Sequence, residues 1–191
     1  MQLPPHRKTM HHFNTPGHIH LLTFSCNGRR PLLNNDLWRR WLSGGIDRTF
    51  ESQKWQLISF VYMPEHIHLL ARPTEEQYRV DALLFAIKRP LSYKIKTALL
   101  NNDSQLAQDL MVVERPGKTS FRFWQEGGGH DRNLFTTETC IKATEYLHHN
   151  PVRRGLCKSP DQWRWSSWKF FHEPDAYSQD AALPRVHGFL G

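Results

Sequence analysis

The segment 54–72 constrains the fold more than any other part of the chain. It reads KWQLISFVYMPEHIHLLAR and is dense in the β-branched and aromatic residues that favour strands. The run is interrupted once, at Pro64 and Glu65, where the composition is typical of a turn. We therefore predict two strands joined by a tight connection, close to the centre of a sheet.

Further elements are expected on both sides of this pair. A first strand is predicted at 18–26, and a helix at 37–52 that two adjacent glycines weaken. Residues 76–100 have a helical pattern, but Pro90 is expected to break it or to start a second helix. A polar connector at 101–120 leads to a short FRFW strand and a flexible loop of three glycines.

The last predicted element is a helix at 137–150. Thr136 or Thr137 can cap it, and Pro151 is expected to end it. The order strand, helix, strand, strand, helix, strand, helix predicts an α+β fold: a ferredoxin-like antiparallel sheet with helices packed on it, plus a C-terminal tail. We expect a loose arm at 1–15, one domain at 16–172 and the tail at 173–191. Trp163, Trp165 and Trp168, which precede this tail, should serve core packing.

Composition limits the classes of function. The 25 lysine and arginine residues exceed the 18 acidic residues, so the net charge is +7, which fits either a polyanion-binding protein or a merely soluble basic one. Three cysteines without CxxC spacing indicate neither a disulfide framework nor a structural zinc site. No apolar run is long enough for a membrane span and no signal peptide is apparent, so a cytoplasmic protein is expected.

A pair of histidines lies on the second of the two predicted strands. Side chains alternate between the faces of a strand, so His66 and His68 project together while Ile67 faces the opposite layer. The same spacing occurs at His18 and His20 on the first strand. A pair of this kind is more often two half-exposed histidines than a metal site, so a second group has to converge on one of them.

The helix at 137–150 supplies such a group. The helical period places Lys142, Tyr146 and Asn150 along one stripe, which can face the histidine pair. The helix can then pack on the sheet through the neighbouring apolar stripe of Cys140, Ala143 and Leu147.

Two imidazoles and the Asn150 amide would suit a hard divalent cation with open positions for water or phosphate. Asn150 also lies near the C-terminus of the helix, where the macrodipole favours a cation. The alternative is that Asn150 only caps the helix.

Three motifs together carry a resemblance to a known family. The runs VYMPEHIHLLARP, FWQEGGGHDRNL and YLHHNPVRRGL resemble the REP-associated tyrosine transposases, relatives of the insertion-sequence transposases in the HUH single-tyrosine class. The likeness spans about residues 18–170. It implies a ferredoxin-like fold and an enzyme that cleaves and rejoins single-stranded DNA, expected at hairpin-forming repeats.

The resemblance also implies roles for individual residues. Mg²⁺ or Mn²⁺ would be held by His66 and His68, with Asn150 as third ligand, and Tyr146 would be the nucleophile that becomes linked to a 5′ phosphate. The histidines at 18 and 20 fall on the family's first strand and are not its metal pair. Lys142 would neutralise charge at the transition state, although a solvated helix lysine is the commoner case.

Basic residues flank these positions and are expected to follow a DNA backbone. They are Lys88, Arg89, Lys94 and Lys96 on one helix, and Arg153 and Arg154 after the last one. The alternative is a solvated helix face. Some family members with this longer C-terminal tail act as monomers, so the resemblance favours a monomer over a homodimer. No nucleotide-binding signature is present, so no nucleotide cofactor is expected.

Two other functions fit the same residues. The chain could be a catalytically silent nucleic-acid-binding module, or a metal nuclease in which water attacks the phosphate in place of Tyr146. A covalent adduct between protein and DNA separates the three.

Overall fold

The computed structural model describes residues 14–189 of the chain. The strands are β1 Ile19–Ser25, β2 Trp55–Tyr62, β3 His66–Pro73, β4 Met111–Arg115, β5 Lys118–Phe121 and β6 His130–Leu134. The helices are α1 Asp36–Ser52, α2 Val80–Asn101, α3 Gln105–Asp109, α4 Thr137–Arg153, α5 Trp168–His172 and α6 Pro174–Ser178, with short 3₁₀ turns at Asn27–Arg29, Leu32–Asn34 and Pro160–Gln162.

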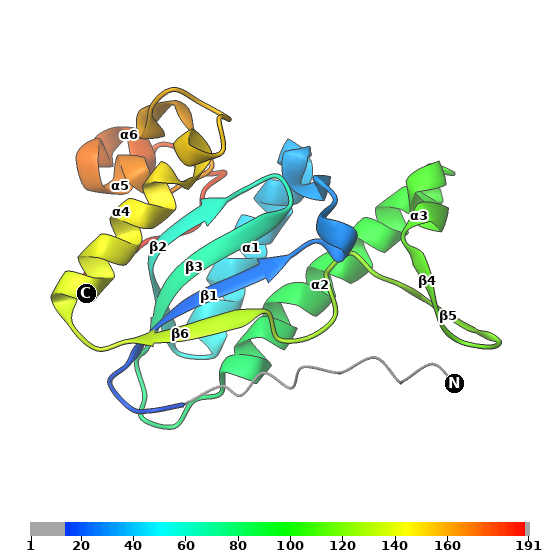
Figure 1. Ribbon diagram of the computed structural model, residues 1–191, viewed down its shortest axis with the longest axis horizontal. Coiled ribbons are helices and arrows are strands. Elements are labelled where there is room, and N and C mark those ends of the chain that lie inside the picture. The colour runs from blue at the N-terminus through cyan, green and yellow to red at the C-terminus, as the bar shows by residue number, and fades with distance from the viewer. Residues whose placement is uncertain (1–13, 190–191) are drawn as a thin grey trace.

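The centre of the fold is a four-stranded sheet in the order β2-β3-β1-β6, antiparallel throughout. The chain passes from β1 through α1 to β2, and from β3 through α2 towards β6, so each passage skips one strand of the sheet. Helices α1 and α2 lie behind the sheet and α4 lies in front of it (Figure 1). The predicted antiparallel sheet with helices packed on it is confirmed.

Strand register places one row of residues across the sheet. Val61 of β2 lies opposite His68 of β3, His68 lies opposite Thr23 of β1, and Thr23 lies opposite His130 of β6. Residues directly opposite one another in antiparallel strands project from the same face. This row therefore faces α4.

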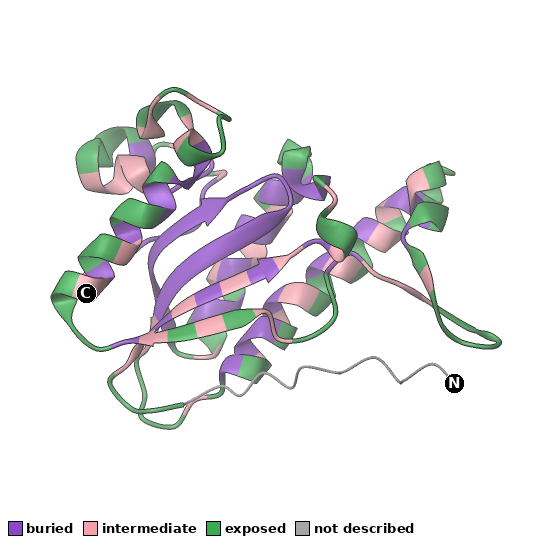
Figure 2. Ribbon diagram, in the orientation of Figure 1, coloured by how far each residue is buried: buried purple, intermediate pink, exposed green. Residues whose placement is uncertain are grey.

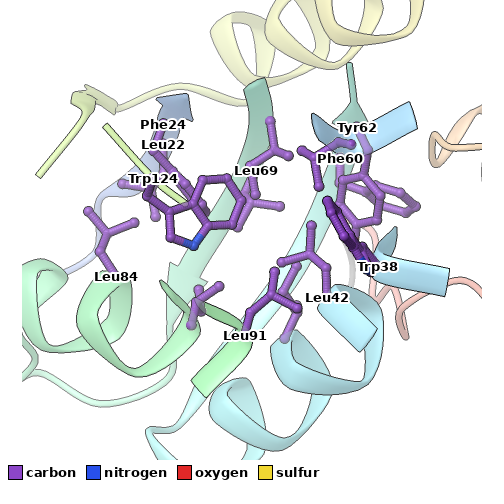
Figure 3. Close-up of a cluster of buried hydrophobic side chains, with 14 of the residues drawn as sticks. Leu22, Phe24, Trp38, Leu42, Phe60, Tyr62, Leu69, Leu84, Leu91 and Trp124 are labelled. Atoms are coloured by element: carbon purple, nitrogen blue, oxygen red, sulfur yellow. The ribbon is translucent and has the colours of Figure 1, made fainter. Parts of the chain in front are cut away.

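Both faces of β2 and β3 are buried, and this explains why these two strands are apolar almost without interruption (Figure 2). The larger core fills the space between the sheet and α1 and α2, and it includes Phe24, Trp38, Phe60, Leu69 and Leu91 (Figure 3). The smaller core joins the other face to α4 through residues such as Ile58, Val61, Leu70 and Leu147. Each fully buried side chain of this size contributes about 1.5–3 kcal/mol.

Helix α2 runs through Pro90 without a break, so the predicted interruption is wrong. A proline inside a helix leaves the carbonyl of the residue four positions earlier without its usual donor. That carbonyl belongs to Ala86, and the hydroxyl of Thr49 on α1 donates to it at 3.5 Å. The neighbouring helix therefore supplies part of what the proline removes, and α1 is itself continuous through its two adjacent glycines.

The end of α4 also differs from the prediction. Thr136 caps its start, as expected, but the helix continues past Pro151 to Arg153. It ends in a Schellman turn, in which the Gly155 amide donates to the Val152 carbonyl and the Leu156 amide to the Pro151 carbonyl. Gly155 has the positive φ of 67° that this turn requires. Asn150 is consequently inside the helix and is not its cap.

The segment between α2 and β6 was predicted least well. Residues 101–120, expected to be a polar connector, contain α3 and most of a two-stranded hairpin of β4 and β5 that projects from the body (Figure 1). The fourth strand of the main sheet is β6 rather than the predicted FRFW segment, whose Phe121 ends β5 and whose Trp124 forms an isolated bridge to Cys26. An edge strand with one exposed face tolerates the polar residues of β6, and its composition therefore hid it.

The C-terminal segment packs on the domain. Trp165 is buried and Trp163 packs against the larger core, which agrees with the packing role expected for these tryptophans, and Tyr177, Leu183 and Val186 join the same core. Of the predicted N-terminal arm, residues 1–13 lie outside the described residues. Within residues 14–189 no helix combines the length and apolar character that a membrane crossing requires.

The glycine loop before β6 gives a test of packing. Gly129 has a φ of +79°, and a Cβ there would lie 2.3 Å from the Thr23 carbonyl oxygen. Gly127, with a φ of +98°, has open space around it. Gly129→Ala should lower the free energy of unfolding by roughly 2–3 kcal/mol, whereas Gly127→Ala should cost about 1 kcal/mol from backbone conformation alone. Urea unfolding midpoints measure both, and equal losses would contradict the close approach of Gly129 to β1.

Candidate active site

His66 and His68 meet at the start of β3, directly after the Pro64-Glu65 connection. Both side chains are almost fully buried on the face that α4 covers. Their Nε2 atoms are 2.9 Å apart and the two rings are perpendicular. Burial lowers the pKa of His66, and it lowers that of His68 to about 3, so both imidazoles are neutral near neutral pH.

The Nδ1 atoms of both histidines have partners on their outer side. His66 Nδ1 lies 3.1 Å from the Glu65 carboxylate, and His68 Nδ1 lies 2.7 Å from the Thr23 hydroxyl. An ionised carboxylate only accepts, so His66 donates from Nδ1 and keeps a lone pair on Nε2. Outer hydrogen bonds of this kind fix the tautomer and ring orientation of metal-binding histidines.

Glu65 is held in turn from α4. Its carboxylate is 3.0 Å from the Arg154 guanidinium. Burial alone would raise the pKa of Glu65, but its interactions with His66 and with the Arg154 guanidinium lower it overall. A single carboxylate therefore connects the turn before β3 with the end of α4.

Asn150 of α4 completes the group. Its amide nitrogen lies 3.1 Å from His68 Nε2, and the residue is buried. An amide can present its oxygen in the same place if its end is turned over. Three potential ligand atoms thus converge from β3 and α4.

This group fits a divalent cation with imidazole and oxygen ligands. Two ligands at about 2.1 Å and at right angles around an octahedral ion would be about 3.0 Å apart, which agrees with the observed separation of the Nε2 atoms. Among residues 14–189, no group of three or more histidine, cysteine, aspartate or glutamate side chains is arranged so that it could hold a metal ion by itself. The donor set of His66, His68 and Asn150 therefore depends on the amide, which suits Mg²⁺ or Mn²⁺ better than Zn²⁺.

Tyr146 lies one helical turn before Asn150 and is 44% exposed, so its phenol can be reached from solvent. Its ring centroid is 6.2 Å from that of His68, and the Arg153 guanidinium carbon lies 5.2 Å from the centre of the ring. A cleft of about 430 Å³ opens beside it, between α4 and the sheet. Polar residues that line the cleft are Thr23, His68, His130, Arg132, Thr139, Lys142 and Tyr146.

Lys142 lines this cleft but is not a free charge. It forms an ion pair of 2.5 Å with Glu138, one turn earlier on α4, and both side chains are exposed. An exposed pair of this kind is weak, so an approaching phosphate can compete for the ammonium group.

The first histidine pair lies elsewhere. His20 is fully buried on the opposite side of the sheet, where Nδ1 lies 2.9 Å from Asp131 and Nε2 lies 2.9 Å from the Tyr78 hydroxyl. His18 lies beside Asn133 and Phe135 at the start of β1. Both nitrogens of His20 have partners, which favours a structural role for it.

The basic residues expected to bind DNA separate into two groups. Arg153 and Arg154 lie at the site, through the contacts with Tyr146 and Glu65. The four lysines and arginines of α2 belong to the helical layer on the other side of the sheet. Lys88 and Arg89 border the glycine loop, whereas Lys94 lies over Trp41 of α1 and faces away from it.

Several residues of the site were not found from the sequence. Glu65 directly precedes the histidine pair and could have been identified by its position, since metal-binding histidines usually have such a partner. Thr23 and His130 reach the cleft through strand register, and the sequence alone gives no signal for that.

A buried polar cluster anchors α4. His148 Nε2 lies 2.9 Å from the Ser167 hydroxyl, which lies 2.9 Å from that of Ser59 on β2. The Phe60 amide donates to the same Ser167 oxygen at 2.9 Å. Burial, together with His172 and His149, lowers the pKa of His148 to about 3, so the cluster is neutral. It joins the helix that carries Tyr146 to β2 and to the C-terminal segment.

The chain is similar to known transposases in sequence and in fold. Residues 15–111 match the family described as "Transposase IS200 like". A curated protein of Haemophilus influenzae, named as a REP-associated tyrosine transposase, is 20% identical over 168 residues, which is 87% of this chain and 88% of that protein. The solved structure of a REP-associated tyrosine transposase bound to a REP hairpin superimposes with a TM-score of 0.67 at 15% identity, over 96% of this chain and 95% of that one.

The convergence of His66, His68 and Asn150 predicts Mn²⁺ binding that calorimetry can measure. His68→Ala should remove detectable binding, because it deletes the ligand at the centre of the group. Glu65→Gln should weaken binding by about tenfold, because the neutral amide holds His66 less firmly. His18→Ala is the matched control and should bind Mn²⁺ like the unaltered protein. Equal loss in His18→Ala and His68→Ala, or no loss in either, would show that the metal binds elsewhere.

Proposed function

The chain belongs to the IS200-like transposase family and is therefore a DNA transposase, and we propose that it cleaves and rejoins single-stranded DNA through a covalent bond between Tyr146 and a 5′ phosphate. The observation that carries this proposal is the position of Tyr146. Its half-exposed phenol lies beside the buried group of His66, His68 and Asn150, at the mouth of a cleft lined by basic side chains.

The chemical step requires a nucleophile aligned with the scissile phosphate. The Tyr146 oxygen attacks phosphorus, the bond between phosphorus and the 3′ oxygen breaks, and the products are a 5′-phosphotyrosine and a free 3′ hydroxyl. The phenol proton can pass to water because the ring is open to solvent. The 3′ oxygen takes up a proton as it leaves.

The chain's own residues orient the Tyr146 nucleophile and neutralise the negative charge of the phosphate. The Arg153 guanidinium above the Tyr146 ring restricts the ring and adds positive charge, and Lys142 can exchange Glu138 for the phosphate. His66, His68 and Asn150 would hold Mg²⁺ or Mn²⁺. When bound, such an ion polarises a non-bridging oxygen of the phosphate and orients it for attack.

Rejoining follows from the same chemistry. One phosphodiester is exchanged for another of nearly equal energy, so a different 3′ hydroxyl can attack the phosphotyrosine and release Tyr146 without ATP. This agrees with the lack of a phosphate-binding glycine loop of the GxxxxGK[ST] type in the sequence.

The substrate we propose is hairpin-forming DNA with an unpaired segment at the scissile phosphate. The net charge of +7 and the basic cleft favour a polyanion, and the protein in the similar solved structure is bound to a REP hairpin. A DNA substrate makes the cytoplasm the expected compartment. We propose a monomer, because the histidine pair, Asn150 and Tyr146 of a single chain already lie together at one site.

The role of Tyr146 is tested by removing its hydroxyl. Tyr146→Phe keeps the ring that contacts His68 and Arg153, so folding and DNA affinity should change little, while the nucleophile is lost. Incubation with labelled hairpin DNA and Mn²⁺ should give a denaturation-resistant adduct with the unaltered protein and none with the variant.

The alternatives predict other outcomes of the same experiment. If the unaltered protein cuts DNA and no adduct forms, the protein is a nuclease that uses water. If it binds DNA in Mn²⁺ and neither cuts nor forms an adduct, it is a binding module. If Tyr146→Phe still forms the adduct, another residue is the nucleophile.

Substrate preference gives a second test. Hairpins with unpaired flanks should bind best and be cut, because the nucleophile needs an unpaired phosphate, and affinity should fall steeply as salt rises. Fluorescence anisotropy over a salt series, with gel analysis of cleavage, measures both. Equal cutting of fully paired duplex DNA would exclude a single-strand mechanism.

A further inference from the structure

A second cavity lies on the other side of β6 from the cleft. It has a volume of about 700 Å³ and is formed by the first three turns of α2 and the glycine loop before β6. Three basic side chains and one acidic side chain line it, namely Arg79, Lys88, Arg89 and Asp81. Its lining therefore has a surplus of positive charge, which favours an anionic ligand.

An aromatic side chain that lines this cavity is exposed to solvent. Phe85 is 59% exposed, although most of the leucine and isoleucine side chains of the same helix are buried. The Arg89 guanidinium carbon lies 5.3 Å from the centre of its ring. An exposed aromatic ring beside arginine is the combination on which unpaired bases stack while the phosphates remain near positive charge.

Lys88 fixes the opposite wall of the cavity. Its ammonium group donates to the Gly127 carbonyl at 2.8 Å and lies 5.6 Å from the centre of the Phe24 ring. Burial lowers its pKa. These contacts hold the glycine loop against α2, so the cavity is built into the fold.

The cavity and the catalytic cleft are joined by the glycine loop. Gly128 lines the cavity and His130 lines the cleft, and two residues of chain span at most about 7 Å. Gly129 packs against the backbone of Thr23, so the loop lies close to the surface of β1. Gly127 has open space where a side chain would project. Because β6 is an edge strand, a flexible DNA strand can pass around it from one site to the other (Figure 1).

We propose that the cavity between α2 and the glycine loop binds an unpaired nucleotide of the DNA strand that occupies the catalytic cleft, with its base stacked on Phe85 and its phosphate near Arg89. The proposal rests on the proposed function and adds a specific subsite to it. Of the four basic residues of α2 that were expected to bind DNA, it includes Lys88 and Arg89 but not Lys94 and Lys96, which lie outside this cavity.

Replacement of Phe85 tests the stacking. The probes are a DNA hairpin with unpaired flanks, containing 2-aminopurine at successive flank positions, and the same hairpin without flanks. Phe85→Ala should weaken binding of the flanked hairpin by about tenfold, as expected for the loss of one stacked base. It should also restore 2-aminopurine fluorescence at one flank position. Phe85→Trp should retain both the affinity and the quenching.

The matched control is Tyr93→Ala. Tyr93 is 73% exposed on the same helix but does not line the cavity, so its removal should leave binding of both hairpins unchanged. The proposal is overturned if Phe85→Ala binds the flanked hairpin normally, if it weakens both hairpins equally, or if Tyr93→Ala has the same effect.

The adduct assay keeps the two proposals distinguishable. Phe85 lies outside the catalytic cleft, so Phe85→Ala should still form the Tyr146 adduct at saturating DNA. Normal binding by Phe85→Ala with an intact adduct would refute the subsite alone. Absence of the adduct in the unaltered protein would refute the proposed function, whereas 2-aminopurine quenching would still report whether Phe85 holds a base.

Discussion

The position of β1 between β3 and β6 is the constraint on which the site depends. Because Thr23 lies opposite both His68 and His130, one register supplies the hydroxyl that holds His68 and brings a third histidine to the wall of the cleft. A shift of one residue would turn Thr23 to the other face and place an apolar neighbour beside His68. The buried leucines and Phe24 that alternate with these positions resist such a shift, so the hydrophobic core fixes the hydrogen bonds of the histidine pair.

The second half of the site depends on how α4 is held. Cys140 and Leu147 pack on the sheet, and the neutral cluster of His148, Ser59 and Ser167 fixes the helix along its length. Asn150 and Tyr146 are one turn apart and lie on the same side of the helix. With the helix held in this rotation, the Asn150 side chain is buried and the Tyr146 ring remains partly exposed to solvent. Apolar packing sets the distance between α4 and the sheet, while the buried hydrogen bonds set the position of α4 along its own axis.

Sequence patterns predict the parts of this arrangement that local chemistry decides. Strand alternation places His66 and His68 on one face, helical periodicity aligns Tyr146 with Asn150, and Thr136 caps α4 as expected. Sequence patterns fail where a residue far away in the sequence determines the local structure. Pro90 stays within a helix because Thr49 approaches from α1, and β6 is a strand because β1 pairs with it despite its polar sequence. Thr23 and His130 belong to the site through a strand register that only the folded chain shows.

The C-terminal segment closes the outer edge of β2, and this has a consequence for the chain while it is being synthesised. Backbone groups of Leu57, Phe60 and Tyr62 bond to residues between 163 and 187, and Ser167 of the same segment holds His148 of α4. These residues leave the ribosome after the strand and the helix that they contact. A chain that ends before them would expose the edge of β2, which is a template for pairing with other chains, and would leave α4 without one of its anchors. We therefore expect chains that terminate before residue 163 to aggregate instead of forming the site around Tyr146.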